Sequence, residues 1–160
     1  MITLISGIPG TGKTFIGDYL TEHHEFIHVD LESQAGNQFL TRLQQQDFDG
    51  FVAQVSSLGD RIAMTFGYPP EWLPVIEQLA ARGVVTAWLD SPLLFSRKHW
   101  QPKPGQDPLT YTVQIAKIID AHKQLDAFYG ERKICVSDSN GDDFLPIEDI
   151  VTRLLSMKNG

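Results

Sequence analysis

The chain has 160 residues, of which 42% are hydrophobic and 21% are charged, and its formal net charge at pH 7 is −7. This length and composition predict one globular domain and exclude a mainly disordered chain or a long repeat array. The negative charge argues against a broad nucleic-acid-binding surface, because it repels phosphate backbones, and favours small ligands.

Short apolar runs alternate along the chain with stretches whose apolar residues recur every three or four positions. The first pattern is typical of buried strands and the second of amphipathic helices. In chain order they predict strand 2–6, helix 13–24, strand 26–30, two short helices between 36 and 58, strand 61–66, helix 72–79, strand 84–90, a long helix 111–129, strand 133–137 and helix 146–155. Strands that alternate with helices in this way predict an α/β fold with a parallel sheet.

Four features between or within these elements carry predictions of their own. The prolines and glycine of residues 99–108 predict a surface loop. Cys135 is the only cysteine, which excludes an intrachain disulfide, and its apolar surroundings predict a buried thiol. His122 belongs to an apolar stripe and is expected in the core. Residues 138–149 resemble a calcium-binding loop only superficially, because Asp replaces both the required Gly and the final Glu.

Residues 7–14 match the phosphate-binding pattern G-x-x-x-x-G-K-[ST] completely and lie between a predicted strand and a predicted helix. Glycines allow backbone N–H groups to approach a phosphate, and the helix N-terminus adds partial positive charge. In this pattern Lys13 bridges the β- and γ-phosphates and Thr14 supplies a hydroxyl to magnesium. ATP is preferred over GTP because no guanine-reading N-K-x-D motif is evident. The predicted nucleotide-binding residues are Gly7, Ile8, Pro9, Gly10, Thr11, Gly12, Lys13 and Thr14.

Four segments together resemble the P-loop small-molecule and nucleoside monophosphate kinases, such as the shikimate, gluconate and adenylate kinases. They are GIPGTGKT at 7–14, Asp30 at the end of the second predicted strand, IAMTFGYPP at 62–70 and WLDSPLLFSR at 88–97. The resemblance implies the P-loop NTPase fold over residues 1–160: three α/β/α layers around a five-stranded parallel sheet. It also implies short acceptor-binding helices at about 33–58 and a lid at about 95–110.

The resemblance assigns roles to two further residues. Asp30 is implied to contact magnesium, the acceptor hydroxyl or both, and Arg97 is implied to reach across the nucleotide from the lid. With Lys13, these are the predicted catalytic residues, and Thr14 and Asp30 are the predicted metal ligands. The structural alternatives are a helix-capping or solvated carboxylate for Asp30 and a solvated helix end for Arg97.

The chain also departs from the family pattern. The third predicted strand ends in Thr65-Phe66-Gly67, without the acid that many P-loop proteins place there to hold magnesium through water. His28 stands where shikimate kinases have a second acid. The segment that follows differs from the adenylate kinase pattern, so shikimate and a standard nucleoside monophosphate are both poor acceptor candidates. Arg42, Glu32 and Tyr68 are predicted to contact the substrate, Arg42 because a guanidinium binds phosphate or carboxylate bidentately. A solvent-facing Arg42 and a core Tyr68 are the alternatives.

The leading functional hypothesis is a kinase that transfers the ATP γ-phosphoryl group to a small-molecule or nucleotide acceptor, with Mg2+ as cofactor. Two alternatives stay open: a nucleotide-dependent switch or weak NTPase without an acceptor, and a kinase of polynucleotide ends. The expected partners are ATP and the acceptor, and the chain is expected to be a monomer or homodimer. The lone cysteine, the lack of a basic segment before the first apolar run, and the lack of an apolar stretch near 20 residues predict a cytoplasmic protein without membrane contact.

Overall fold

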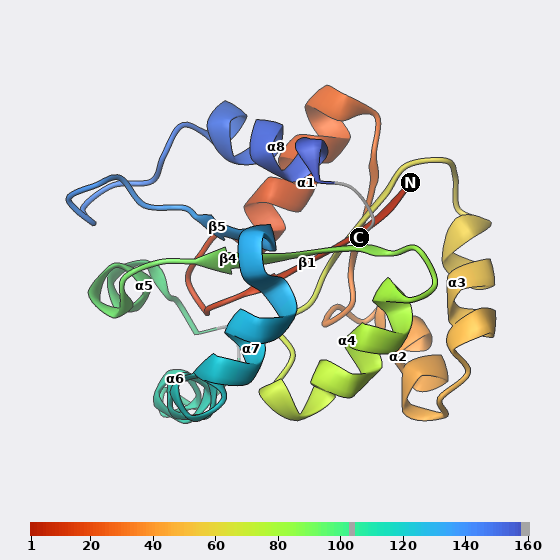
Figure 1. Cartoon of the computed structure of the whole chain (residues 1–160), viewed down its shortest axis with the longest axis horizontal. Helices are drawn as coiled ribbons and strands as arrows, with labels where there is room; N and C mark the ends of the chain where they lie inside the picture. The colour runs from red at the N-terminus through yellow and green to blue at the C-terminus, as the bar shows by residue number, and fades with distance from the viewer. Residues whose placement is uncertain (103–104, 158–160) are drawn as a thin grey trace.

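The structure is a computed structural model that describes residues 1–102 and 105–157. Its centre is a five-stranded sheet in the order β2-β3-β1-β4-β5, in which every neighbouring pair is parallel (Figure 1). The strands are β1 (Ile2–Gly7), β2 (Ile27–Asp30), β3 (Ile62–Thr65), β4 (Val85–Asp90) and β5 (Lys133–Cys135). The predicted parallel sheet is therefore confirmed. Residues 103 and 104, which belong to the predicted loop and lid, lie outside the described residues.

Helices cover both faces of this sheet (Figure 1). They are α1 (Lys13–His24), α2 (Asn37–Gln44), α3 (Phe48–Ser56), α4 (Leu73–Ala80), α5 (Leu93–His99), α6 (Thr110–Asp120), α7 (His122–Tyr129) and α8 (Ile147–Ser156), with short 3-10 turns η1 (Pro70–Trp72) and η2 (Gly130–Arg132). Within the described part of the chain, no helix has the length and apolarity needed to cross a bilayer.

Two apolar clusters, one on each face, hold the layers together. The first packs the sheet against α2, α3, α4, α6 and α7 and contains Phe39, Phe51, Ile76, Ile115 and Leu125. The second packs it against α1, α5 and α8 and contains Ile16, Leu20, Phe95, Ile150 and Leu154. Uninterrupted apolar sequences predict strands that are buried on both faces. The helices on the two faces bury the central strands in this way. The expected three-layer α/β/α fold is confirmed.

The central position of β1 decides where the phosphate-binding motif lies. β1 pairs with β3 on one side and with β4 on the other, and Ile5 is the partner of both Thr65 and Ala87. Parallel strands present their carboxyl ends at one edge of the sheet, which is the edge where open α/β folds bind ligands. The loop that follows Gly7 therefore emerges at the middle of that edge, with Asp30 and Thr65 on neighbouring strands.

The prediction of one long helix over 111–129 was wrong, because two helices occupy this stretch. The backbone leaves helical geometry at Ala121 (φ −94°, ψ 6°), where α6 ends and α7 begins. His122 is exposed rather than in the core, and its Nδ1 donates to the carbonyl of Ile119 at 2.7 Å. The apolar spacing continues across the break because both helices pack on the same face of the sheet.

The predicted burial of Cys135 was also wrong. Cys135 is the last residue of β5, which is the edge strand and pairs only with β4. Successive side chains of a strand point to opposite faces, and here Ile134 points into the core while Cys135 points outward. An apolar run predicts a strand with buried side chains. In an edge strand some of these side chains can still be exposed to solvent, as Cys135 is here.

Candidate functional site

The phosphate loop connects the end of β1 to the start of α1. Gly10 has φ +82°, and a Cβ added there would lie 2.4 Å from the carbonyl oxygen of Ser96, so the loop passes directly against the backbone of α5. No side chain caps the N-terminus of α1, which begins at Lys13 after Gly12. In an α-helix the first N–H groups have no partner within the helix itself, and a helix that follows a glycine-rich loop can bind an anion with them.

Side chains of the loop stabilise its curled shape. The Thr11 hydroxyl is fully buried and donates to the carbonyl of Ile8 at 2.7 Å. Lys13 Nζ donates to the carbonyls of Gly7 and Ile8 at 3.1 and 3.0 Å, so its ammonium group lies within the curve of the loop. The predicted nucleotide-binding residues thus form one continuous loop between β1 and α1, and their binding of a nucleotide stays a prediction.

The α5 helix is hydrogen-bonded to the phosphate loop. The buried Ser96 hydroxyl donates to the carbonyl of Pro9 at 2.6 Å and lies 2.8 Å from the hydroxyl of Tyr111 on α6. The Tyr111 hydroxyl also lies 3.1 Å from the carbonyl of Leu93. These contacts join three segments that are distant in sequence, and they place the predicted lid directly beside the loop.

A cavity of about 730 Å³ opens from the phosphate loop. One wall is the loop itself, the second is the turn between β3 and η1, and the third is formed by the end of α5 and the outer face of α6. Its lining residues are Gly7, Pro9, Gly10, Gly12, Lys13, Thr14, Phe15, Glu32, Gly67, Tyr68, Pro69, Pro70, His99, Trp100, Gln101, Gln106, Val113, Gln114, Lys117 and Ile118. The cavity therefore has room beyond the phosphate loop for a second small molecule.

Two of the three predicted substrate residues, Glu32 and Tyr68, line this cavity. The Glu32 carboxylate accepts from the backbone N–H of Gly67 at 2.9 Å. Tyr68 is 3% exposed, and its hydroxyl is bonded to that of Tyr129. Burial raises the pKa of both phenols, that of Tyr129 to about 12, so both stay neutral and neither serves as a base.

Arg42, the third predicted substrate residue, lies elsewhere. Its guanidinium pairs with Asp47 at 2.5 Å and with the side-chain oxygen of Gln54 at 2.7 Å. The pair holds the pKa of Asp47 below its usual range. No described residue between 33 and 58 lines the cavity, so the structure does not bring the predicted acceptor helices to it.

Arg97, the predicted lid cation, is exposed on α5 and is not among the lining residues. Its guanidinium carbon lies 5.6 Å from the ring centre of Trp100 and 5.2 Å from that of Tyr111. These distances are typical of cation–π contacts, which stabilise the arginine in this position. Its proposed reach across a nucleotide remains a prediction.

His99 is a lining residue whose role the sequence did not reveal. Its ring packs against Phe95 at 4.4 Å and Phe144 at 4.8 Å between ring centres. Its Nε2 is buried and has no hydrogen-bond partner among the described residues. A buried, unpartnered ring nitrogen beside a phosphate loop is a candidate ligand for the bound nucleotide. In the sequence, the only feature that distinguishes His99 is its position after Arg97 and Lys98. This signal is too weak to predict a role.

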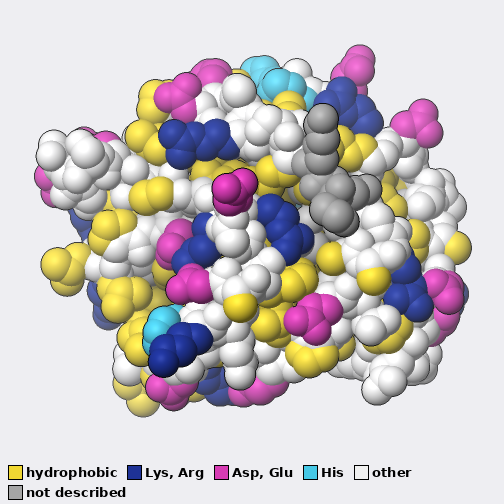
Figure 2. All heavy atoms as spheres, in the orientation of Figure 1, with side chains coloured by type: hydrophobic (Ala, Val, Ile, Leu, Met, Phe, Trp, Pro, Cys, Tyr) yellow, Lys and Arg dark blue, Asp and Glu magenta, His cyan; other side chains and the backbone are white. Residues whose placement is uncertain are grey.

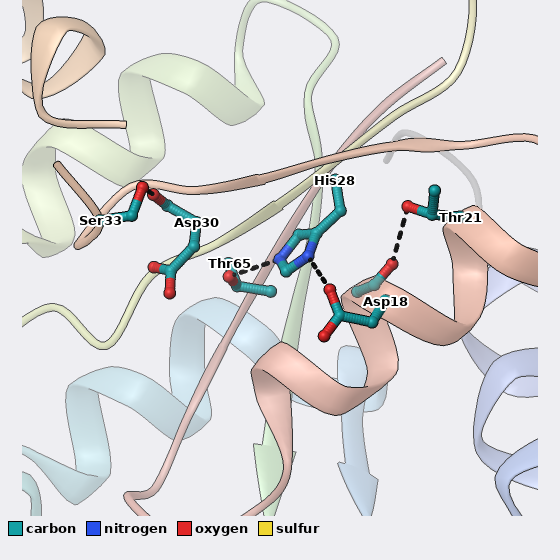
Figure 3. Close-up of polar contacts among 7 residues, drawn as sticks. Asp18, Thr21, His28, Asp30, Ser33 and Thr65 are labelled. Atoms are coloured by element: carbon teal, nitrogen blue, oxygen red, sulfur yellow. Dashed lines mark hydrogen bonds and ion pairs between the residues drawn. The ribbon is translucent and has the colours of Figure 1, made fainter. Parts of the chain in front are cut away.

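The two predicted metal ligands follow the ends of two different strands, Thr14 after β1 and Asp30 at the end of β2. Asp30 is the last residue of β2 (Figure 3). One of its carboxylate oxygens accepts from the N–H of Glu32 at 3.0 Å. Thr14 is exposed in the first turn of α1 and lines the cavity, whereas Asp30 is not among the lining residues. In the described part of the chain, no group of three or more His, Cys, Asp or Glu residues could hold a metal. A hydroxyl and one carboxylate fit magnesium, which keeps several waters and takes further oxygens from substrate phosphates.

On the face drawn in Figure 2, Lys and Arg side chains are interspersed with Asp and Glu and do not gather in one extended patch. An electrostatic footprint for nucleic acid is a stripe or cluster of basic residues. This face therefore offers no such footprint.

Comparison with known proteins shows which solved structures share this fold. No protein-family model and no curated protein matches the sequence. A shikimate kinase from Aquifex aeolicus vf5 is 14% identical, with a TM-score of 0.58 over 97% of this chain and 94% of that one. A shikimate kinase from Acinetobacter baumannii, solved in complex with shikimate, is 18% identical, with a TM-score of 0.57 over 97% and 91%. A gluconokinase from Sinorhizobium meliloti 1021 is 15% identical, with a TM-score of 0.52 over 97% and 89%. The chain therefore has the fold of the P-loop kinases of the shikimate and gluconate type.

Proposed function

We propose that this chain is a magnesium-dependent kinase that transfers the γ-phosphoryl group of ATP to a small-molecule acceptor. The observation that carries the proposal is the cavity of about 730 Å³, which begins at the phosphate loop and continues past it. A nucleotide switch needs only the first part of this space. The second part, between the β3–η1 turn and α6, is suited to a second substrate.

The phosphate loop supplies most of the charge stabilisation in this reaction. Backbone N–H groups at the start of α1 bind the phosphates, and Lys13 moves from the carbonyls of Gly7 and Ile8 to the β- and γ-phosphate oxygens. Thr14 and Asp30 would hold magnesium, which when bound would neutralise charge that develops on the phosphates. Little covalent chemistry is left to the protein, since phosphoryl transfer depends mainly on positioning and electrostatics.

In this proposal Asp30, which ends β2 and is not itself a lining residue of the cavity, orients the acceptor. The acceptor hydroxyl oxygen forms a bond to the γ-phosphorus while the bond from that phosphorus to the β,γ-bridging oxygen breaks, and ADP leaves. The acceptor proton passes to the Asp30 carboxylate late in the transfer. The described part of the predicted lid would contribute His99, which lines the cavity, and Arg97, which would reach the nucleotide if α5 moved.

The acceptor occupies the wall that contains Glu32, Tyr68 and α6. The lining there combines aromatic and proline surfaces with the amides of Gln101 and Gln114. Amides and aromatic faces bind hydroxyl-bearing small molecules through hydrogen bonds and apolar contact. The structural neighbours support a small acceptor, since one is a gluconokinase and another was solved with shikimate bound.

A thermal-shift screen followed by a transfer assay tests this function. The protein is heated with Mg2+ and ATP or GTP, and hydroxyl-bearing metabolites and nucleotides are added one at a time, because ligands of the native state raise the melting temperature. Acceptors that raise it further are incubated with γ-labelled ATP, and the labelled product is identified. Transfer of label to one acceptor supports the kinase. Slow hydrolysis that no acceptor changes would instead support the switch or weak NTPase.

A further inference from the structure

The cavity wall beyond the phosphate loop contains few charged side chains. We call this lining the acceptor wall, and it extends from Glu32 and the β3–η1 turn to Trp100, Gln101 and the outer face of α6. Among its described residues, Glu32 carries the acidic side chain and Lys117 the basic one. An acceptor with a carboxylate or phosphate group would be recognised here by a cation or by a backbone N–H. Lys117 and the N–H of Gly67 are the two candidates for this role.

Lys117 is already paired with a carboxylate of the protein. Its Nζ donates from α6 to a carboxylate oxygen of Glu71 on η1 at 2.8 Å. The hydrogen bond from Lys117 holds the pKa of Glu71 below its usual range, so this carboxylate is charged at neutral pH. The Lys117 side chain is 47% exposed and still lines the cavity. The pair therefore presents a cation whose charge is balanced before any ligand enters.

The backbone donor of the wall is occupied in the same way. The N–H of Gly67, in the turn after β3, donates to Oε2 of Glu32 at 2.9 Å. A Cβ added at Gly67 would lie 3.0 Å from that oxygen, so the backbone and the side chain are in close contact. The Glu32 carboxylate thus fills the position that the carboxylate of an acceptor would need in order to bind this N–H.

The cation that the sequence predicted for an acidic group lies elsewhere. Arg42 is held by Asp47 and Gln54 and is not among the lining residues. The amides of Gln101 and Gln114 do line the acceptor wall. An amide both donates and accepts hydrogen bonds, as a hydroxyl group does, and carries no charge. The polar groups of the wall are therefore matched to hydroxyl groups and not to an anion.

We propose that Glu32 and Glu71 adapt the acceptor wall to an uncharged, hydroxyl-bearing acceptor and exclude acceptors that present a carboxylate or phosphate to it. This inference rests on the proposed kinase function and names its substrate class. An entering anion must displace Glu71 from Lys117 or lie beside it and be repelled. Because Glu71 is part of the same chain, it competes for Lys117 at a high effective concentration. A hydroxyl group meets neither cost, since it can donate to a carboxylate and accept from an ammonium group.

Glucitol and gluconate are suitable probes for this selectivity. They share one carbon skeleton and differ only where gluconate has a terminal carboxylate in place of a CH2OH group. The full chain is first loaded with Mg2+ and a non-hydrolysable ATP analogue, so that the phosphate loop is filled, and each probe is then titrated by ligand-observed NMR. Wild type is expected to bind glucitol more tightly than gluconate. Binding of gluconate as tightly as glucitol, or more tightly, would overturn the proposal.

Glu71→Gln is the decisive variant, because it keeps the shape of the side chain and leaves the charge of Lys117 unbalanced. We expect about fivefold tighter binding of gluconate, the upper range for an exposed ion pair, and glucitol affinity within about twofold of wild type. Adding Lys117→Met to Glu71→Gln should return gluconate to its wild-type affinity, since the ammonium group is then absent. Gluconate binding that does not tighten in folded Glu71→Gln, or that stays undetectable in both proteins, would overturn the proposal.

The matched control is Asp49→Asn, which changes the net charge by the same amount outside the cavity lining. Asp49 forms an ion pair with Arg82, in which the carboxylate oxygen lies 2.6 Å from Nε. Gluconate affinity in Asp49→Asn should stay within about twofold of wild type, because long-range effects of an exposed charge are screened by salt. A gain as large as that in Glu71→Gln would overturn the proposal. Melting temperatures show whether each variant folds.

The transfer assay separates this inference from the proposed function. Transfer of label from ATP to an uncharged hydroxyl compound supports both. Transfer by wild type to an acid, with lower rates for the matching neutral compound, would keep the kinase and overturn the exclusion of anions. Nucleotide binding without transfer to any compound would overturn the kinase, while tighter gluconate binding in Glu71→Gln would still show that Glu71 shields Lys117 from anions.

Discussion

The two halves of the cavity are built in different ways. Six residues of the phosphate loop line the phosphate half, namely Gly7, Pro9, Gly10, Gly12, Lys13 and Thr14, and α5 is hydrogen-bonded to this loop through Ser96. The acceptor half comes from side chains on distant segments, among them Glu32, Tyr68, Trp100 and Gln114. Changes in the phosphate half should therefore abolish binding, whereas changes in the acceptor half should alter selectivity.

The largest effect is expected for Lys13→Met in the phosphate half. The substitution keeps the length of the side chain but removes the charge that stabilises the transferring phosphates. We expect a loss of about 10²–10³ in kcat, the scale seen when one preorganised donor is removed from an active site. The exposed Lys123→Met is the matched control. Equal rates in the two variants would show that Lys13 takes no part in transfer.

Ser96→Ala tests the link between the loop and α5. It leaves the carbonyl of Pro9 without its buried donor, which costs about 1–3 kcal/mol in the free energy of unfolding. Urea unfolding measures this cost, and calorimetry should show weaker ATP binding at the same time. The exposed Ser139→Ala is the control. A destabilised variant with normal ATP affinity would show that α5 supports the fold and not the loop.

His99→Phe acts where the two halves meet. A phenyl ring keeps the packing against Phe95 and Phe144 and removes the buried, unpartnered Nε2. Because an unsatisfied buried polar atom costs stability, the variant should unfold at the same or a higher urea concentration. A hydrogen bond to a charged ligand contributes about 1.5–3 kcal/mol, so ATP affinity should fall about tenfold or more.

The exposed His122→Phe serves as its control, since that ring lies on α7 away from the cavity lining. Unchanged ATP affinity in His99→Phe would remove His99 from the nucleotide site. Lower stability together with lower affinity would indicate a packing role in place of a direct contact.

Arg42→Ala should have the smallest effect, and it tests the extent of the acceptor half. In the structure Arg42 pairs with Asp47 and Gln54 outside the cavity lining. We expect the KM for the acceptor to change less than twofold, as measured by initial rates. A tenfold rise in this KM with an unchanged KM for ATP would show that α2 and α3 close on the acceptor during the reaction.

Much of the fold follows from local sequence. Apolar runs located the five strands to within a few residues, because the strands of a covered parallel sheet are apolar throughout. Helical spacing located most helices, but it left α5 unassigned and merged α6 with α7. The failures came where the environment decided the outcome. His122 lies in an apolar stripe yet faces solvent at a helix break, and Cys135 lies in an apolar run yet points outward from an edge strand.

The sequence by itself determined the phosphate loop, since eight consecutive residues carry both its shape and its chemistry. It also placed Asp30 at the end of a strand, where the structure confirms its position. Tertiary structure alone decided the acceptor wall, the position of His99 and the contact between Lys117 and Glu71. The physical reason is that these groups meet only when separate strands and helices pack, and no spacing along the chain encodes a distance across a sheet.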